Sequence, residues 1–259
     1  MRMMKKVLGT VTVLALSVSL LAGCGSTAVS PVSSTASTAA ESTTSSVVSE
    51  TTSAAADENA ADAAQLLNDL TGSYQELWPV ILADEYQQTW LDDCTALVGE
   101  ENAEAAFEKL SSMVTGDVYG EDAVEAYANG GGAYFCGFTN SLATLTFDGE
   151  TSTISGTDKD GNVLFSHTYH YIGMEPVHGL YEFESDDADS GEFTYFFLAP
   201  DTSAETYHIE FRYGSDAEAL SQYDAGEYAY WVASGISTDC DQTMIDNCIE
   251  LFCTENLAG

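Results

Sequence analysis

The sequence predicts an α+β domain, in which an antiparallel β-structure of the barrel or sandwich type is flanked by helices. Three observations support this class. Residues before the Asn-Gly-Gly-Gly stretch at 129–132 are rich in helix formers, with apolar side chains at helical spacing. After it, short segments rich in Thr, Tyr, Phe and Val alternate apolar and polar residues. Asp-Gly pairs of the hairpin type separate some of these segments.

The start of the chain resembles a bacterial lipoprotein signal peptide. Three basic residues precede an apolar run at 7–20, and Leu-Ala-Gly-Cys follows at 21–24. By this resemblance residues 1–23 are removed and Cys24 is lipidated, so that the protein is anchored to the extracytoplasmic face of the cell membrane. An ordinary secretory signal, or an anchor helix that is short for a bilayer, is the alternative.

The expected signal is followed by a tether and then by one folded domain. Residues 24–56 comprise the cysteine to be lipidated and a stretch of Ser, Thr and Ala without an aromatic residue. Such a composition offers too little apolar surface to offset the entropy of ordering, so the tether is expected to be disordered and dispensable for folding. Residues 57–259 have the length of a single domain.

Helical patterns occur at 57–70, 74–98 and 101–114, and Pro79 marks a helix start or a turn in the second of them. We therefore expect helices before residue 129. An amphipathic pattern near the end of the chain predicts a last helix from about Thr238 to Thr254, capped by Ser237 or Thr238.

The alternating segments predict an antiparallel barrel-like sheet from about Leu142 to Tyr213. Hairpin turns are expected at the Asp-Gly pairs 148–149 and 160–161.

The charge of the chain excludes one class of partner. All 42 acidic residues follow the expected signal, whereas only Lys109, Lys159 and Arg212 of the six basic residues do, so the mature formal charge is −39. Such a surface repels phosphate backbones, and nucleic acid is therefore excluded as a partner. Five cysteines remain besides the one to be lipidated, and one disulfide among them is possible, with its connectivity left open.

Five segments of the chain occur in the order of a known family. They are GSYQELWPVIL (72–82), HYIG (170–173), DADSGEFTY (187–195), YHIEFRYGSDAEAL (207–220) and YAYWVASGIS (228–237). Through these segments the chain resembles the ZinT (YodA) family of extracytoplasmic zinc- and cadmium-binding proteins over roughly residues 66 to 257. The resemblance implies a lipocalin-like (calycin) barrel with packed helices, a divalent metal ion as ligand, and a metal-uptake transporter as a possible partner.

The resemblance also implies where a metal would bind. The family holds its metal with three histidines, two of them as His-x-His on a strand that ends in glycine. Counting back from Gly214, these two positions fall on His208 and Glu210. The third position falls on Asp201 when counted forward from Tyr195, and on Phe196, which cannot be a ligand, when counted back from Ala199-Pro200. One His with two carboxylates would accept zinc or another divalent cation.

The strand that carries this pair has two contrasting faces. His208, Glu210 and Arg212 alternate with Tyr207, Ile209, Phe211 and Tyr213. We expect the charged face to point into the barrel and the apolar face to pack under the helices. The charged groups would then hold a metal, with Arg212 turned away, or would neutralise one another through an Arg212–Glu210 contact.

The other histidines are weaker candidates. His167 and His170 are three residues apart on an expected strand and so lie on opposite faces. His178 precedes Gly179 at an expected turn, where an exposed histidine is common.

The functional prediction is a membrane-anchored, extracytoplasmic metal-binding lipoprotein that captures zinc or a related divalent cation for uptake or homeostasis. No HExxH, GxSxG or Gly-rich phosphate loop is present, so the protein is expected not to be an enzyme. The alternative is a lipocalin-like module that has lost the zinc site and either mediates an interaction or binds a small organic ligand. In that pocket Arg212 would grip a carboxylate, with Tyr195 and Phe197 lining the walls.

Overall fold

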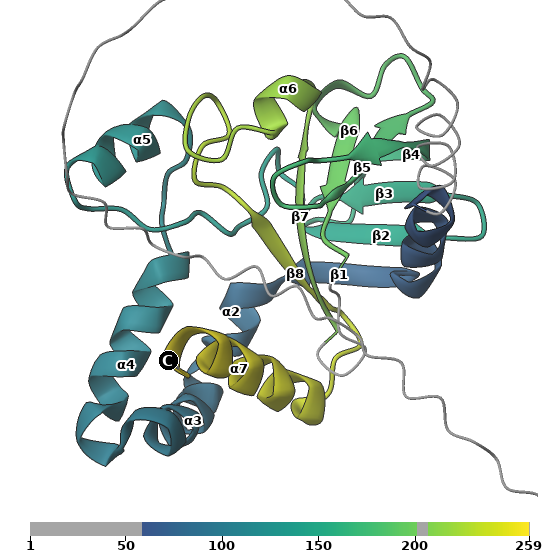
Figure 1. Ribbon diagram of the computed structural model, residues 1–259. Coiled ribbons are helices and arrows are strands. Elements are labelled where there is room, and N and C mark those ends of the chain that lie inside the picture. Colours follow the sequence, from purple (N-terminus) through teal and green to yellow (C-terminus); the bar gives the residue numbers. More distant parts are fainter. Residues whose placement is uncertain (1–58, 201–206, 259) are drawn as a thin grey trace, which may run out of the picture.

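The computed structural model describes residues 59–200 and 207–258, and its centre is a closed barrel of eight antiparallel strands (Figure 1). Each strand pairs with the next in sequence, and the last pairs with the first, which is the order of an up-and-down barrel. The predicted fold class is thereby confirmed. The strands are β1 (Gly72–Glu76), β2 (Thr144–Asp148), β3 (Thr153–Thr157), β4 (Val163–Met174), β5 (Tyr181–Ser185), β6 (Tyr195–Leu198), β7 (His208–Gly214) and β8 (Ala233–Ser237).

Helices precede, interrupt and follow the strands. Residues 59–69 form a helix beside the barrel, and α3, α4 and α7 lie together in a separate layer (Figure 1). The predicted helices at 57–70 and 101–114 are confirmed apart from their exact ends. The labelled helices are α2 (Leu77–Ile81), α3 (Gln87–Val98), α4 (Glu100–Val114), α5 (Glu121–Ala128), α6 (Ala217–Leu220) and α7 (Gln242–Leu257), with short 3₁₀ turns at Asp84–Tyr86 and Gly191–Phe193.

The barrel extends beyond the predicted limits of 142 and 213. Strand β1 lies within residues expected to precede the sheet, and its Tyr74 pairs with Leu145 of β2 and with Ser237 of β8. The prediction of a helix from residue 74 is therefore wrong at its start, and the helical pattern begins at Leu77 instead. The two strands that the prediction missed, β1 and β8, pair with each other although they are far apart in sequence, and local periodicity does not report such a pairing.

The last helix begins later than predicted. Ser237 belongs to β8, and the backbone N–H of Thr238 donates to Ser73, so neither residue caps the helix. The cap is Asp241, whose carboxylate accepts the N–H of Met244 at 3.0 Å.

Both predicted hairpin turns are confirmed. Asp148-Gly149 begins the connection between β2 and β3, and its carboxylate accepts backbone N–H groups of the turn. Asp160-Gly161 lies in the connection between β3 and β4. There Asp158 accepts the N–H groups of Asp160 and Asn162, each at 2.9 Å, which satisfies the loop from within.

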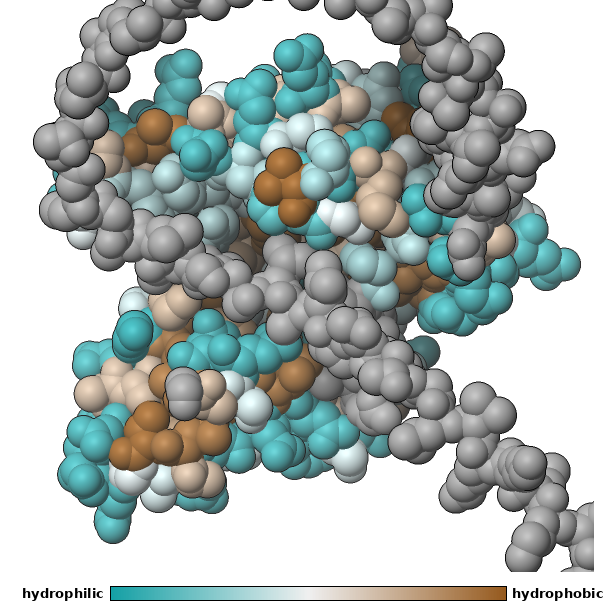
Figure 2. Space-filling model, viewed as in Figure 1, coloured by the Kyte–Doolittle hydropathy of each residue, from teal (hydrophilic) through white to brown (hydrophobic). Residues whose placement is uncertain are grey.

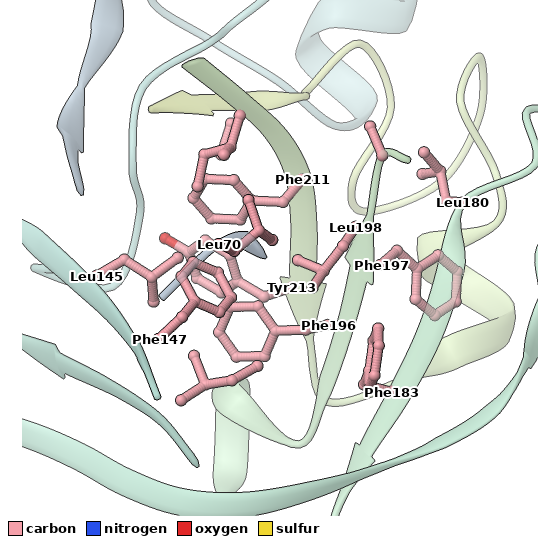
Figure 3. Packing of buried hydrophobic residues seen from close by; sticks show 14 of the residues in the cluster. Leu70, Leu145, Phe147, Leu180, Phe183, Phe196, Phe197, Leu198, Phe211 and Tyr213 are labelled. Atoms are coloured by element: carbon pink, nitrogen blue, oxygen red, sulfur yellow. The ribbon is translucent and has the colours of Figure 1, made fainter. Parts of the chain in front are cut away.

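The barrel interior is packed with aromatic and aliphatic side chains. In Figure 3 the rings of Phe147, Phe196 and Tyr213 gather between the strands, and Phe211 lies beside them. An eight-stranded barrel is just wide enough for side chains to fill it. The helix at 59–69 adds Leu66 and Leu67 to this core, and Leu70, directly after the helix, joins them.

A second hydrophobic core lies outside the barrel, between its wall and the helical layer. Trp78 and Trp90 pack there with Phe252 of α7, and Ile236 of β8 joins them from the barrel wall. The face shown in Figure 2 is largely hydrophilic, and hydrophobic residues gather in its lower part, over the helical layer. Within the described residues, none of the helices has the length and apolar composition needed to cross a bilayer. The expected signal, Cys24 and the tether lie outside those residues.

Candidate functional site

Strand β7 directs its apolar face into the barrel and its charged face outward, which is the reverse of the prediction. Ile209, Phe211 and Tyr213 are at most 2 % exposed and belong to the interior core. His208 is paired with Ile236 and Glu210 with Ser234, so both point with those residues toward the outer layer. The expectation that the His208–Glu210–Arg212 face lines the barrel interior was therefore wrong.

The cost of burying charge explains this orientation. The interior is filled by rings, so an inward carboxylate or guanidinium would lose its hydration without gaining a partner. The outer face offers polar backbone groups and a cavity instead. Tyr207, which alternation placed on the apolar face, directly precedes the strand and is 40 % exposed.

Arg212 is completely buried, and its guanidinium is occupied by the protein itself. It donates to the carbonyls of Leu220, Gln222 and Tyr228 and lies 4.1 Å from the centre of the Tyr223 ring. Burial lowers the pKa of this guanidinium. Arg212 therefore fastens the segment 220–228 to the outer face of β7.

These contacts bear on both roles considered for Arg212. In the ranges 59–200 and 207–258, none of the salt bridges involves Arg212, so the direct Arg212–Glu210 ion pair does not form. The predicted organic-ligand pocket around Arg212, lined by Tyr195 and Phe197, stays a prediction. Phe197 is fully buried opposite Arg212 on the neighbouring strand, and the Tyr195 hydroxyl donates to Glu184 at 3.2 Å. Asp201, the predicted third metal ligand, lies outside the described residues.

A cavity of about 370 Å³ lies between the outer wall of the barrel and the helical layer. Glu210 and Ser234 contribute from the barrel wall, and Glu255 and Asn256 from α7. His208 stands two residues away from Glu210 on the same outward face. The lining is mixed, with four aromatic side chains beside carboxylates and an imidazole. It comprises Trp78, Met113, Val114, Tyr134, Cys136, His178, Glu210, Tyr223, Val232, Ser234, Phe252, Glu255 and Asn256.

His178 lies at the predicted turn, where it is half-buried and lines this cavity. Its side chain is 27 % exposed, its ring centre lies 3.8 Å from that of Tyr223, and Nδ1 lies 3.3 Å from Glu175 Oε2. Glu175 is fully buried and accepts the backbone N–H groups of Val177 and His178. No sequence pattern indicated this arrangement, because it depends on the β4–β5 connection meeting the chain near residue 223.

The remaining histidines each contact a carboxylate on the far side of the β4–β5 hairpin. His167 Nδ1 lies 2.8 Å from Asp187, and His170 Nδ1 lies 2.8 Å from Asp186. Their placement on opposite faces of β4 agrees with the alternating burial of that strand. Both lie outside the cavity lining.

Two buried polar groups, the indole N–H of Trp78 and the thiol of Cys136, belong to residues that line the cavity. The indole N–H of Trp78 is buried and has no hydrogen-bond partner among the described residues, apart from its closeness to the sulfur of Cys136, a weak acceptor. Burial, with the negative charge of Glu210 as a further cause, raises the pKa of the Cys136 thiol to about 12.

The described residues offer two donors that suit a divalent cation. An imidazole nitrogen and a carboxylate oxygen two residues apart on one strand can both reach one ion, and zinc accepts both. Within the described part of the chain, no group of three or more His, Cys, Asp or Glu side chains is arranged to hold a metal ion. A complete site thus needs at least one ligand besides His208 and Glu210.

The fold and this arrangement define an eight-stranded antiparallel barrel with a polar site on its outer wall. No protein-family model and no curated protein sequence matches the chain. Among solved structures, the Zn(II)-bound ZinT-like domain of Streptococcus pneumoniae AdcA matches with 16 % identity and a TM-score of 0.45, over 71 % of this chain and 89 % of that one.

A second match is the structure of Zn(II)-bound AdcA from Streptococcus pneumoniae. Its identity is 14 % and its TM-score 0.43, and the alignment covers 72 % of this chain and 35 % of that protein. At these values neither likeness indicates which ligand this chain binds.

Proposed function

We propose that the protein is a lipid-anchored, extracytoplasmic lipoprotein that captures zinc or a related divalent cation for uptake or homeostasis. The observation that carries this proposal is the outward-facing pair His208 and Glu210 on β7. The pair stands at the positions where the sequence resemblance implies metal ligands. Asp201 completes the predicted ligand set, and Cys24 is the predicted point of lipidation. The protein acts by binding, not by catalysis.

Charge supports the same role. A mature charge of −39 concentrates cations around the protein and attracts them toward its surface. That attraction does not select among cations, so selectivity has to come from the imidazole and its carboxylate neighbours. A metal-uptake transporter is the partner to which a captured ion would pass.

Arg212 does not oppose the proposal. Its Nη1 and Nη2 donate to backbone carbonyls at 220–228, which commits these two nitrogens to the protein, whereas Nε has no hydrogen-bond partner within the described residues. The rigid attachment of that segment also keeps Tyr223 beside the cavity.

The test is a zinc titration of the mature chain by competition with a chromophoric chelator. We expect His208→Ala to weaken zinc binding by at least about tenfold, since even residues behind the ligands cost 10–100-fold in metal affinity. His170→Ala is the matched control, because His170 is also a strand histidine beside a carboxylate. Each titration is run against Mg²⁺ at equal ionic strength.

Equal affinity in wild type and His208→Ala would contradict the proposal. So would an equal loss in both variants, because zinc would then be held by the acidic surface in general. The proposal is supported if wild type and His170→Ala bind zinc more tightly than Mg²⁺ and His208→Ala does not.

One observation favours a second candidate function, binding of a small organic ligand. The cavity is aromatic-walled and borders the buried Trp78 N–H, which lacks a strong acceptor within the described residues. A ligand with a carboxyl or carbonyl group would accept from Trp78. Native mass spectrometry of protein purified from its host tests this candidate. A bound organic molecule whose occupancy falls in Trp78→Phe would support it. A spectrum that contains only metal-loaded and metal-free protein would reject it.

A further inference from the structure

We propose that Cys94 and Cys253 form a disulfide that joins α3 to α7 in the oxidising environment outside the cytoplasm. The location rests on the proposed function, whereas the pairing rests on geometry. Cys94 lies on α3 and Cys253 on α7, the two helices pack against each other, and the Sγ atoms are 3.9 Å apart. Both side chains are fully buried.

The distance is compatible with a bond after a small adjustment. A disulfide has an S–S length of about 2.05 Å, so the sulfurs would have to approach by about 2 Å. Side-chain rotation of two cysteines that already face each other supplies much of this movement. Cys136, Cys240 and Cys248 make no comparable sulfur contact within the described residues. The odd number of cysteines in the domain is thus resolved into one pair and three thiols.

The reaction requires an oxidant. The two thiols lose two protons and two electrons and form one S–S bond. The electrons reduce the disulfide of an extracytoplasmic thiol–disulfide oxidoreductase to two thiols, through a mixed disulfide. Burial raises the pKa of both the Cys94 and the Cys253 thiols in the folded protein, so the reactive thiolate is scarce there. The bond therefore forms during folding, before α7 has closed over α3.

The bond would enclose nearly the whole domain. The chain between the two cysteines contains the last seven strands of the barrel, from β2 to β8, and only β1 precedes it. Closing so long a loop restricts the unfolded chain, and this stabilises the folded state. Reduction of the purified wild-type protein should therefore lower Tm by about 5–15 °C.

The direct experiment maps the bond in the exported full chain. Free thiols are blocked with iodoacetamide in denaturant without reductant, and the protein is cleaved after glutamate, because only three Lys or Arg residues follow the signal. Cleavage places Cys94 in peptide 86–100, Cys253 in peptide 251–255, and Cys240 and Cys248 together in peptide 228–250. We expect peptides 86–100 and 251–255 to be cross-linked until reductant is added.

Carbamidomethylated Cys94 and Cys253 in that digest would overturn the proposal. A second arm separates it from the proposed location. Purified protein is reduced and unfolded in denaturant and then refolded in a glutathione redox buffer, where the Cys94–Cys253 bond must form in preference to any other, and a failure to form there also overturns the pairing. Mass analysis of the Cys24 peptide for lipid tests the location by itself.

Cysteine variants show whether a disulfide bond, and not only the packing of two small side chains, stabilises the protein. The double variant Cys94→Ser/Cys253→Ser should have a Tm that reductant does not change. Cys248→Ser is the matched control, since Cys248 is a buried cysteine on the same helix. In Cys248→Ser, reductant should still lower Tm as it does in wild type. If reductant no longer lowered Tm in this control, the pairing of Cys94 with Cys253 would be contradicted.

Discussion

The two faces of β7 differ in what they contact. The inward face, with Ile209, Phe211 and Tyr213, is sealed among rings inside the barrel. The outward face carries His208 and Glu210 at half-buried positions, and Glu210 borders a cavity of about 370 Å³. In a lipocalin-type barrel the interior is the expected place for a ligand. Here the interior stabilises the fold, and the groups that we propose to bind a ligand lie on the outer face of the barrel wall.

The largest expected effect is the difference in the free energy of unfolding between a substitution on the inward face of β7 and one on its outward face. Phe211→Ala removes a ring with no exposed surface and leaves a cavity, so we expect a loss of about 3–5 kcal/mol in the free energy of unfolding. Glu210→Gln keeps the shape of a side chain on the opposite face and should change it far less. Chemical denaturation of both variants measures the difference. Similar losses in the two would show that the outer face also holds the fold together.

A smaller effect is expected at Arg212, which is charged but serves packing. Arg212→Met should lower the free energy of unfolding by about 3 kcal/mol, because three carbonyls lose a charged donor. Arg212→Lys should not restore it, since an ammonium lacks the planar fork that reaches several acceptors. Zinc affinity of any variant that folds should stay close to wild type. A zinc affinity that falls in step with stability would place Arg212 in the metal site.

The smallest expected effect concerns Asp93, which lies where α3 faces α7. Burial raises its pKa, and the charges of Glu250, Asp246 and Asp92 raise it further. One carboxylate oxygen has no hydrogen-bond partner within the described residues. The folded protein therefore binds a proton here more readily than the unfolded chain. This contribution to stability increases as pH falls toward and through the raised pKa, and it is lost as pH rises.

Asp93→Asn removes the charge that disfavours the helical layer. We expect its Tm to exceed that of wild type by about 1–3 °C at pH 7, and the difference to shrink at pH 4–5. Asp92→Asn, on the exposed neighbour that accepts from Gln88, is the control and should change Tm less. Thermal melts across this pH range give the comparison. A Tm difference that grows on acidification would contradict the assigned sign.

The sequence predicted the part of the barrel in which strands that are neighbours in sequence pair with each other. Alternation between 142 and 213 identified the region of β2 to β7, because each of these strands pairs with its neighbour in sequence. It missed β1 and β8, whose pairing joins residue 74 to residue 237. A five-residue strand held by distant partners carries almost no periodic pattern of its own.

For the site, alternation correctly placed His208 and Glu210 on one face but could not say which face is inside. The volume of Phe211 and Tyr213 was the available clue, because a barrel of this size is filled by its own side chains. The cavity could not be predicted, since Trp78, His178, Glu210 and Glu255 come together only in the folded chain. The third metal ligand, Asp201, stays a prediction.

The central claim is that a divalent cation binds on the outer wall of the barrel and not inside it. Anomalous diffraction at the zinc edge, from crystals of the mature chain grown with zinc, tests this most directly. The account predicts a peak about 2.0–2.2 Å from an imidazole nitrogen of His208 and a carboxylate oxygen of Glu210. A peak elsewhere, or no ordered peak while both side chains are well resolved, would contradict it.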